Sequence, residues 1–146
     1  MIVRVSKLLK APAEQAFDAW LDPEIACKFL FATPQGEMQK TQIDARVGGS
    51  FLIIERRDGV SIDHTGVYLE INRPRRITFL FSVPAYSRST TRVSIGVLRM
   101  EGGCEVVVAQ EGVEEAQARQ VEEGWRSILE GLQAVLIPAA APVVAE

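Results

Sequence analysis

Residues 113–136 read VEEAQARQVEEGWRSILEGLQAVL, and in this stretch Val121, Trp125, Ile128 and Leu132 recur at steps of four and three. This spacing places their side chains on one face of an α-helix. The pattern predicts a long amphipathic helix over the whole stretch. Its apolar face needs a partner layer, which the rest of the chain has to supply.

Two glycines interrupt this predicted helix. Gly124 and Gly131 lie seven residues apart, hence on nearly the same face, and each weakens an isolated helix by roughly 1 kcal/mol relative to alanine. Such glycines favour close packing of the helix against a sheet. Alternatively, they leave room for a ligand beside Trp125.

The region before the helix is predicted to be mostly β-strand. Alternating or β-prone residues are interrupted by turn signals such as Gly48-Gly49 and Asp58-Gly59. We predict strands at residues 2–10, 37–45, 50–57, 61–71, 76–83, 89–100 and 104–111. Two short helices should follow the first strand, one starting near Ala11 and one capped by Asp22.

These elements predict an α+β fold in which a curved antiparallel sheet of about seven strands (six or seven) surrounds the final helix. The length of 146 residues fits one domain, which we assign to residues 1–136. Residues 137–146 contain prolines and small residues without a period, and we expect a flexible tail there.

Composition excludes several classes of function. The formal net charge is -3, so there is no basic excess for a phosphate backbone and nucleic acid is not an expected partner. No apolar run has the length of a signal peptide or of a membrane span, and we expect a cytoplasmic protein without membrane insertion. His64 is the only histidine, and Cys27 and Cys104 match no metal spacing. We therefore expect neither a metal nor a cofactor.

Strand parity predicts which apolar side chains face the final helix. Together with apolar residues of the helix, these are the candidates for the lining of a cavity. They are Phe51, Val67, Leu69, Phe79, Phe81, Val93, Ile95, Val106, Val108, Trp125, Ile128 and Leu132.

Three polar residues share the opposite face of one predicted strand. By parity His64, Tyr68 and Glu70 point to solvent, unless a bulge at Gly66 redirects them. If they face inward, they are candidate polar groups of the cavity, where His64 could act as an acid or base.

Several segments, in their joint order, resemble one known family. They are AEQAFDAWLDPE at 13–24, DARVGGSF at 44–51, GVYLEI at 66–71, PRRITF at 74–79 and EGW at 123–125. In these segments the chain resembles the Hsp90-ATPase-activator-homologue group of the START/Bet v 1-like superfamily. Two positions depart from the pattern, since Gln110 stands where relatives often have histidine and Phe29 where a tryptophan is expected.

The resemblance implies a helix-grip fold with a cavity between sheet and helix that related proteins use for lipids, polyketides and other apolar molecules. From it we expect a module that binds an apolar or aromatic small molecule. Two alternatives remain open. One is a protein-interaction module acting on a chaperone or on a second copy of the chain as a homodimer. The other is a cyclase or hydrolase that uses His64, Tyr68 and Glu70.

Overall fold

A computed structural model describes residues 1–137 and shows seven strands in one antiparallel sheet. The order across the sheet is β1-β7-β6-β5-β4-β3-β2. The strands are β1 Ile2–Leu9, β2 Glu37–Ile43, β3 Ser50–Arg57, β4 Val60–Asn72, β5 Arg76–Ser82, β6 Thr91–Met100 and β7 Gly103–Glu111. The predicted tail lies outside the described residues except for Ile137.

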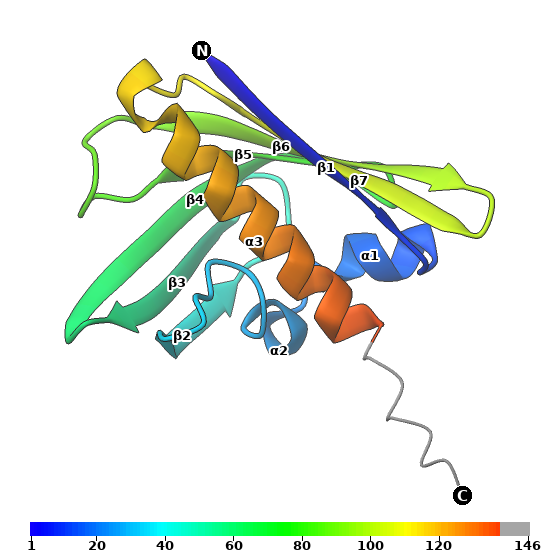
Figure 1. Ribbon diagram of the computed structural model, residues 1–146, viewed down its shortest axis with the longest axis horizontal. Coiled ribbons are helices and arrows are strands. Elements are labelled where there is room, and N and C mark those ends of the chain that lie inside the picture. Colours follow the sequence, from blue (N-terminus) through cyan, green and yellow to red (C-terminus); the bar gives the residue numbers. More distant parts are fainter. Residues whose placement is uncertain (138–146) are drawn as a thin grey trace, which may run out of the picture.

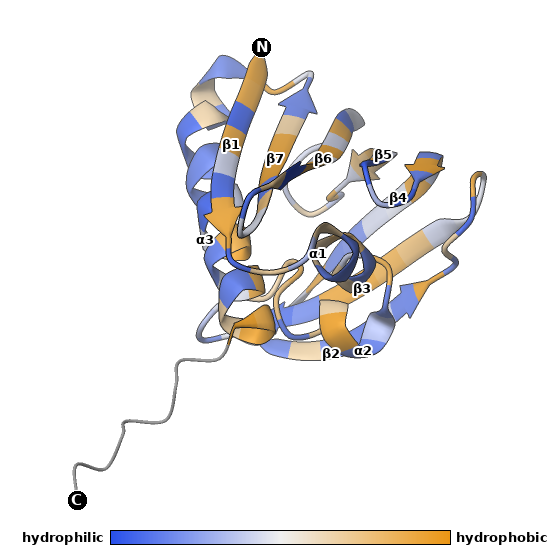
Figure 2. Ribbon diagram, turned by 90° about the vertical axis from the view of Figure 1, so that its right-hand side faces the viewer, coloured by the Kyte–Doolittle hydropathy of each residue, from blue (hydrophilic) through white to orange (hydrophobic). Residues whose placement is uncertain are grey.

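The long helix α3, Ala118–Leu136, crosses one face of the curved sheet, as Figure 1 shows. Its apolar face is buried through Trp125, Ile128, Leu129 and Leu132. Buried side chains alternate with exposed or half-buried ones along β1 and β7, and β1 lies beside α3 in Figure 2. This arrangement is the predicted helix-grip fold, and it buries one continuous core between the sheet and α3.

The final helix begins later than predicted. A 3₁₀ turn, η1 Glu115–Gln117, precedes α3, and Val113 is not helical. Val113 instead exchanges two hydrogen bonds with Met1, from Val113 N to Met1 O at 3.1 Å and from the Met1 amino group to Val113 O at 2.9 Å. Because these bonds continue the pairing of β1 with β7, Val113, the first residue of the predicted helix, belongs to the sheet side of the fold.

Two short helices, α1 Ala13–Ala19 and α2 Pro23–Ala26, follow β1 as predicted. Asp22 caps α2, since its carboxylate accepts a hydrogen bond from Glu24 N at 3.0 Å. The helices bring Trp20 and Phe29 together edge to face, with ring centroids 5.2 Å apart. This aromatic pair joins the short helices to the core beneath α3.

Strand β4 is turned opposite to the parity prediction. Val67 and Leu69 are 42% and 40% exposed, while His64 and Tyr68 are each 3% exposed. The prediction that Val67 and Leu69 face inward is therefore wrong. A register shift between Tyr68 and Glu70 then turns Glu70 to the outer face, where it pairs with Arg76 at 3.4 Å.

Gly66 explains why β4 has this orientation. It pairs with Phe51 of β3 and Phe81 of β5. A Cβ at Gly66 would lie 2.2 Å from Cε2 of Phe51, so the Phe51 ring occupies the space above the glycine. Only a residue without a side chain allows this contact, and the neighbours of Gly66 on the same face, His64 and Tyr68, are consequently buried.

Of the helices in the described part of the chain, none combines the length and the hydrophobicity needed to cross a membrane.

Candidate ligand-binding site

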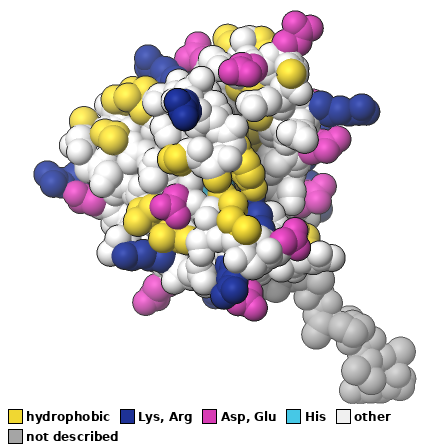
Figure 3. Space-filling model, turned by 90° about the vertical axis from the view of Figure 1, so that its left-hand side faces the viewer, with side chains coloured by type: hydrophobic (Ala, Val, Ile, Leu, Met, Phe, Trp, Pro, Cys, Tyr) yellow, Lys and Arg dark blue, Asp and Glu magenta, His cyan; other side chains and the backbone are white. Residues whose placement is uncertain are grey.

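A cavity of about 530 Å³ lies between the first half of α3 and the sheet. Gln117, Val121, Gly124 and Ile128 line it at the spacing of one helix face. The opposite wall comes from the ends of β3 to β7, the segment after α2 and the β5–β6 loop. Figure 3 shows the face onto which the cavity opens, with hydrophobic side chains gathered in a central hollow.

Aromatic rings form one wall of the cavity. Phe31, in the segment after α2, has φ 57° and lies nearly parallel to His64 and to Phe81, with centroid distances of 4.6 and 4.9 Å. It also meets Trp125 of α3 edge to face at 5.9 Å. Since Phe31 contacts rings from β4, β5 and α3, it joins the helix to the sheet at the cavity wall.

A buried ion pair lies beside this wall. Glu55 is 1% exposed and accepts hydrogen bonds from Arg57 Nε and from the backbone and hydroxyl of Thr33. Arg57 also donates through Nη1 to the Tyr86 hydroxyl at 2.9 Å and through Nη2 to Phe31 O at 3.3 Å. Arg57 therefore links β3 to the segment after α2 and to the β5–β6 loop.

His64 is held as a neutral imidazole at the same wall. Its Nδ1 lies 3.1 Å from Ile53 O, a carbonyl that can only accept, so Nδ1 carries the proton. Its Nε2 lies 3.4 Å from Arg57 Nη2 and accepts from it. Burial is the main cause that lowers the pKa of His64 from 6.5 to about 4. The side chain is uncharged at neutral pH.

Gln110 of β7 orients the tryptophan of α3. Its Oε1 accepts from Trp125 Nε1 at 2.7 Å, and its Nε2 donates to Thr91 Oγ1 at 2.9 Å. All three residues line the cavity. The amide thus satisfies the buried indole nitrogen that faces the sheet and fixes the ring as part of the wall.

The two glycines of α3 have different surroundings. Gly124 lines the cavity, and a Cβ there would meet nothing within 4 Å. A Cβ at Gly131 would lie 3.2 Å from the Phe29 Cβ, and Gly131 does not line the cavity. The sequence left two explanations for these glycines, room for a ligand and close packing. Gly124 fits the first, because it borders open space, and Gly131 fits the second, because it allows close packing.

The structure brings only some of the sequence-predicted residues to the cavity. Phe81, Trp125, Ile128 and His64 line it. The remaining inward residues lie in the core outside this lining: Phe51, Tyr68, Phe79, Val93, Ile95, Val106, Val108 and Leu132. Val67, Leu69 and Glu70 lie on the outer face.

The three residues that were candidate polar groups of the cavity are separated. Burial raises the pKa of the Tyr68 hydroxyl, which lies in the core, and Glu70 is on the other side of the sheet from His64. The bulge in β4 is the reason, since it reverses the side-chain alternation after Tyr68. The structure therefore does not assemble His64, Tyr68 and Glu70 into the polar group that the cyclase or hydrolase alternative required.

The residues of the site that sequence reasoning missed include Phe31, Arg57, Tyr86 and Gln110. The sequence did contain a signal for Arg57, because Phe51, Ile53, Glu55 and Arg57 lie at every second position and therefore share one face of β3. Phe31 and Tyr86 lie outside helices and strands, where no periodicity indicates a direction.

Comparison with known proteins agrees with this architecture. The model of the family described as "Activator of Hsp90 ATPase homolog 1-like protein" matches residues 10–137. No curated protein sequence matches the chain.

Solved structures show the same fold. A protein from Chromobacterium violaceum is 26% identical with a TM-score of 0.86, covering 94% of this chain and 97% of its own. A protein from Aeromonas hydrophila described as similar to the Hsp90 ATPase activator homologue is 20% identical with a TM-score of 0.81, covering 92% of this chain and 91% of its own. Because the family model spans most of the sequence, the chain belongs to the activator of Hsp90 ATPase homologue 1-like family, within the START/Bet v 1-like superfamily.

Proposed function

We propose that this protein binds a small molecule with an apolar or aromatic body in the cavity between α3 and the sheet. The observation that carries the proposal is the cavity itself. Its volume of about 530 Å³ falls within the range of roughly 300–1,000 Å³ that is usual for small-molecule sites. A molecule of two or three fused rings, or a medium-length acyl chain, fits such a space.

The chemistry of the wall supports the same class of ligand. Phe31, Phe81 and Trp125 offer aromatic surfaces, and Val83 and Ile128 add aliphatic ones. Removal of an apolar ligand from water gains roughly 25 cal/mol per Å² of buried apolar surface. A few polar groups at the wall, such as Gln110 and Tyr86, supply directional contacts, as is usual for small-molecule sites.

The first experiment is native mass spectrometry of protein purified gently from its host. We expect a non-covalent adduct in the mass range of a small organic molecule, which organic extraction removes. In parallel, the purified protein is titrated with N-phenyl-naphthylamine, an uncharged dye that fluoresces in apolar surroundings. Saturable binding with loss of tryptophan fluorescence is expected, because Trp125 lines the cavity.

A blocked variant locates the dye. Gly124→Leu places a side chain in the open space beside Val121 and Ile128 and replaces a poor helix former by a good one. Ala134→Leu is the matched control, since Ala134 is exposed on the same helix and does not line the cavity. Gly124→Leu should abolish saturable binding and Ala134→Leu should retain it. Equal binding by both variants, or no binding by the wild type, would contradict the proposal.

A further inference from the structure

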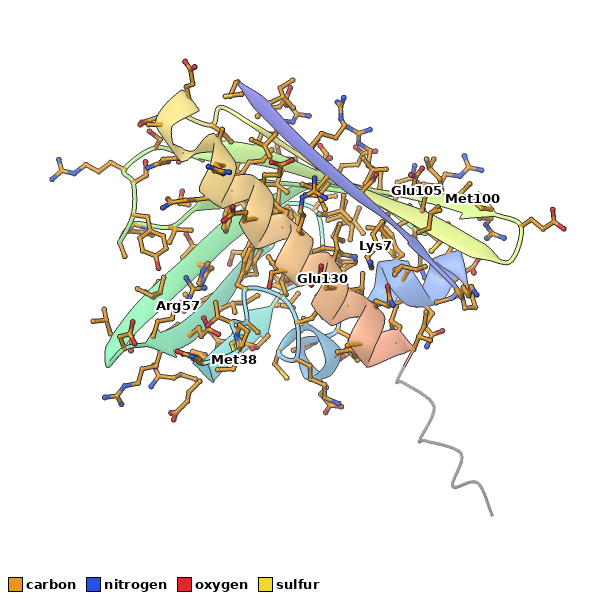
Figure 4. The ribbon with its side chains drawn as sticks, in the orientation of Figure 1. Lys7, Met38, Arg57, Met100, Glu105 and Glu130 are labelled. Carbon is orange, nitrogen blue, oxygen red and sulfur yellow. The ribbon has the colours of Figure 1, made fainter. Side chains whose placement is uncertain are left out.

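Arg57 presents a positive charge to the cavity while its counter-ion lies behind it. The arginine side chain is 24% exposed and lines the cavity. Glu55 does not line it and is covered by Thr33, which donates two hydrogen bonds to the carboxylate. Figure 4 shows Arg57 over the part of the sheet formed by β3 and β4, to one side of α3. The ion pair is thus a dipole with its positive end towards the cavity.

Hydrogen-bond donors remain available to a ligand at the end of the ion pair that faces the cavity. Arg57 Nε is used by Glu55, and Nη2 makes two long contacts, 3.3 Å to Phe31 O and 3.4 Å to His64 Nε2. Nη1 donates once, to Tyr86, and within residues 1–137 its second hydrogen has no acceptor. The Tyr86 hydroxyl accepts that bond, which leaves its own proton available to donate.

The other groups at this wall favour an anion over a cation. His64 is neutral and adds no positive charge, and its Nε2 already accepts from Arg57. Glu114 is the other fully charged residue in the lining, but it is exposed and precedes η1 on the helix side of the cavity. A hydrogen bond from an arginine to a carboxylate is charge-assisted, and such bonds are stronger than those between neutral groups.

We propose that Arg57 and Tyr86 bind an anionic oxygen of the ligand, so that the ligand class is amphipathic acids, an apolar or aromatic body with a carboxylate. The inference rests on the proposed function, because the apolar body occupies the same cavity. The carboxylate accepts from Arg57 Nη1 and from the Tyr86 hydroxyl, and the body lies along Phe31, Phe81 and Trp125.

The test compares two competitors of the same shape. Naphthoate and naphthamide are each used to displace N-phenyl-naphthylamine from the wild-type protein at neutral pH. They share the ring system and one carbonyl oxygen and differ in charge. A charge-assisted hydrogen bond that the amide cannot make should let naphthoate displace the dye at a concentration about tenfold lower, or lower still.

Two variants test whether Arg57 causes the preference for naphthoate over naphthamide. The double variant Glu55→Gln, Arg57→Met removes both charges, so no buried carboxylate is left unpaired, and the new amide oxygen beside Thr33 can still accept from it. In this variant naphthoate should lose its advantage while the dye still binds. Arg56→Met is the control, since Arg56 is exposed on the opposite face of the same strand, and it should leave the ratio of the two competitors unchanged.

The outcomes separate this inference from the proposed function. Equal displacement by naphthoate and naphthamide in the wild type, with saturable dye binding, would overturn the inference and leave the cavity as a binding site for neutral molecules. The same is true if Arg56→Met reduces the preference as much as the double variant does, because an arginine on the opposite face of the strand then has the same effect as Arg57. If the dye does not bind to the wild type at all, the proposed function fails as well.

Discussion

Replacing Gly124 with alanine should stabilise the protein, whereas the same replacement at Gly131 should not. Both glycines lie inside α3, where glycine costs up to about 1 kcal/mol relative to alanine. A Cβ at Gly124 would meet nothing within 4 Å. The full gain in helix propensity should therefore appear as an increase of up to about 1 kcal/mol in the free energy of unfolding.

At Gly131 the same gain is opposed by a contact. The new Cβ would lie 3.2 Å from the Cβ and 3.6 Å from the Cα of Phe29. Phe29 cannot move away freely, since it is fully buried and packs edge to face on Trp20. Overpacking of this kind costs roughly 1–3 kcal/mol, which equals or exceeds the propensity gain. The net change should lie between about 0 and 2 kcal/mol of destabilisation.

Urea denaturation of the wild type, the two single variants and the double variant tests this reasoning. The two sites are seven residues apart, roughly 10 Å along the helix, so their effects should add. The Gly124 variant should be more stable than the Gly131 variant by at least about 1 kcal/mol, with similar denaturant dependence. If Gly131→Ala stabilises as much as Gly124→Ala, then α3 does not pack on Phe29 and the position of the helix is refuted.

Two further predictions concern the cavity wall. The pKa of His64 is lowered to about 4 in the folded protein, so the unfolded chain takes up a proton first as the pH falls. The contribution of neutral His64 to the free energy of unfolding should therefore be fully present above the unfolded pKa of about 6.5 and fall by up to about 3 kcal/mol as the pH decreases to 4. His64→Gln should lack this loss in urea unfolding measured across the same pH range. An identical loss in the variant would contradict the assignment. Gln110→Leu removes the acceptor of Trp125 Nε1, and the unpaired buried indole should cost about 1–3 kcal/mol in urea unfolding together with a shift in tryptophan emission. A variant with unchanged stability and emission would show that the hydrogen bond does not hold the ring.

The order of the elements could be predicted from the sequence because it depends on local patterns. Alternation over five to ten residues indicates a strand, and turn residues mark its ends. Strand β3 was predicted with the bounds it has in the structure, and α2 with its Asp22 cap. The end of α3 agrees for the same reason, whereas its start does not, because Val113 pairs with Met1, a residue from the other end of the chain.

The orientation of β4 could not be predicted from local patterns. Alternation along the strand was visible, but a period of two describes two faces equally well. The choice between them depends on Phe51, which lies above Gly66 from the neighbouring strand. The bulge after Tyr68 then reverses the alternation, and no local turn residue marks it.

The architecture is encoded locally: an antiparallel sheet, two short helices and a long amphipathic helix to cover them. The periods of these elements follow from backbone geometry and can be read without knowledge of distant contacts. The site, in contrast, depends on the folded chain, because Phe31, Arg57 and Tyr86 come from separate segments. Arg57 acquires its role when Glu55 is buried beneath Thr33 and its remaining donors turn towards the cavity, and burial of a charge depends on neighbours that only folding brings together.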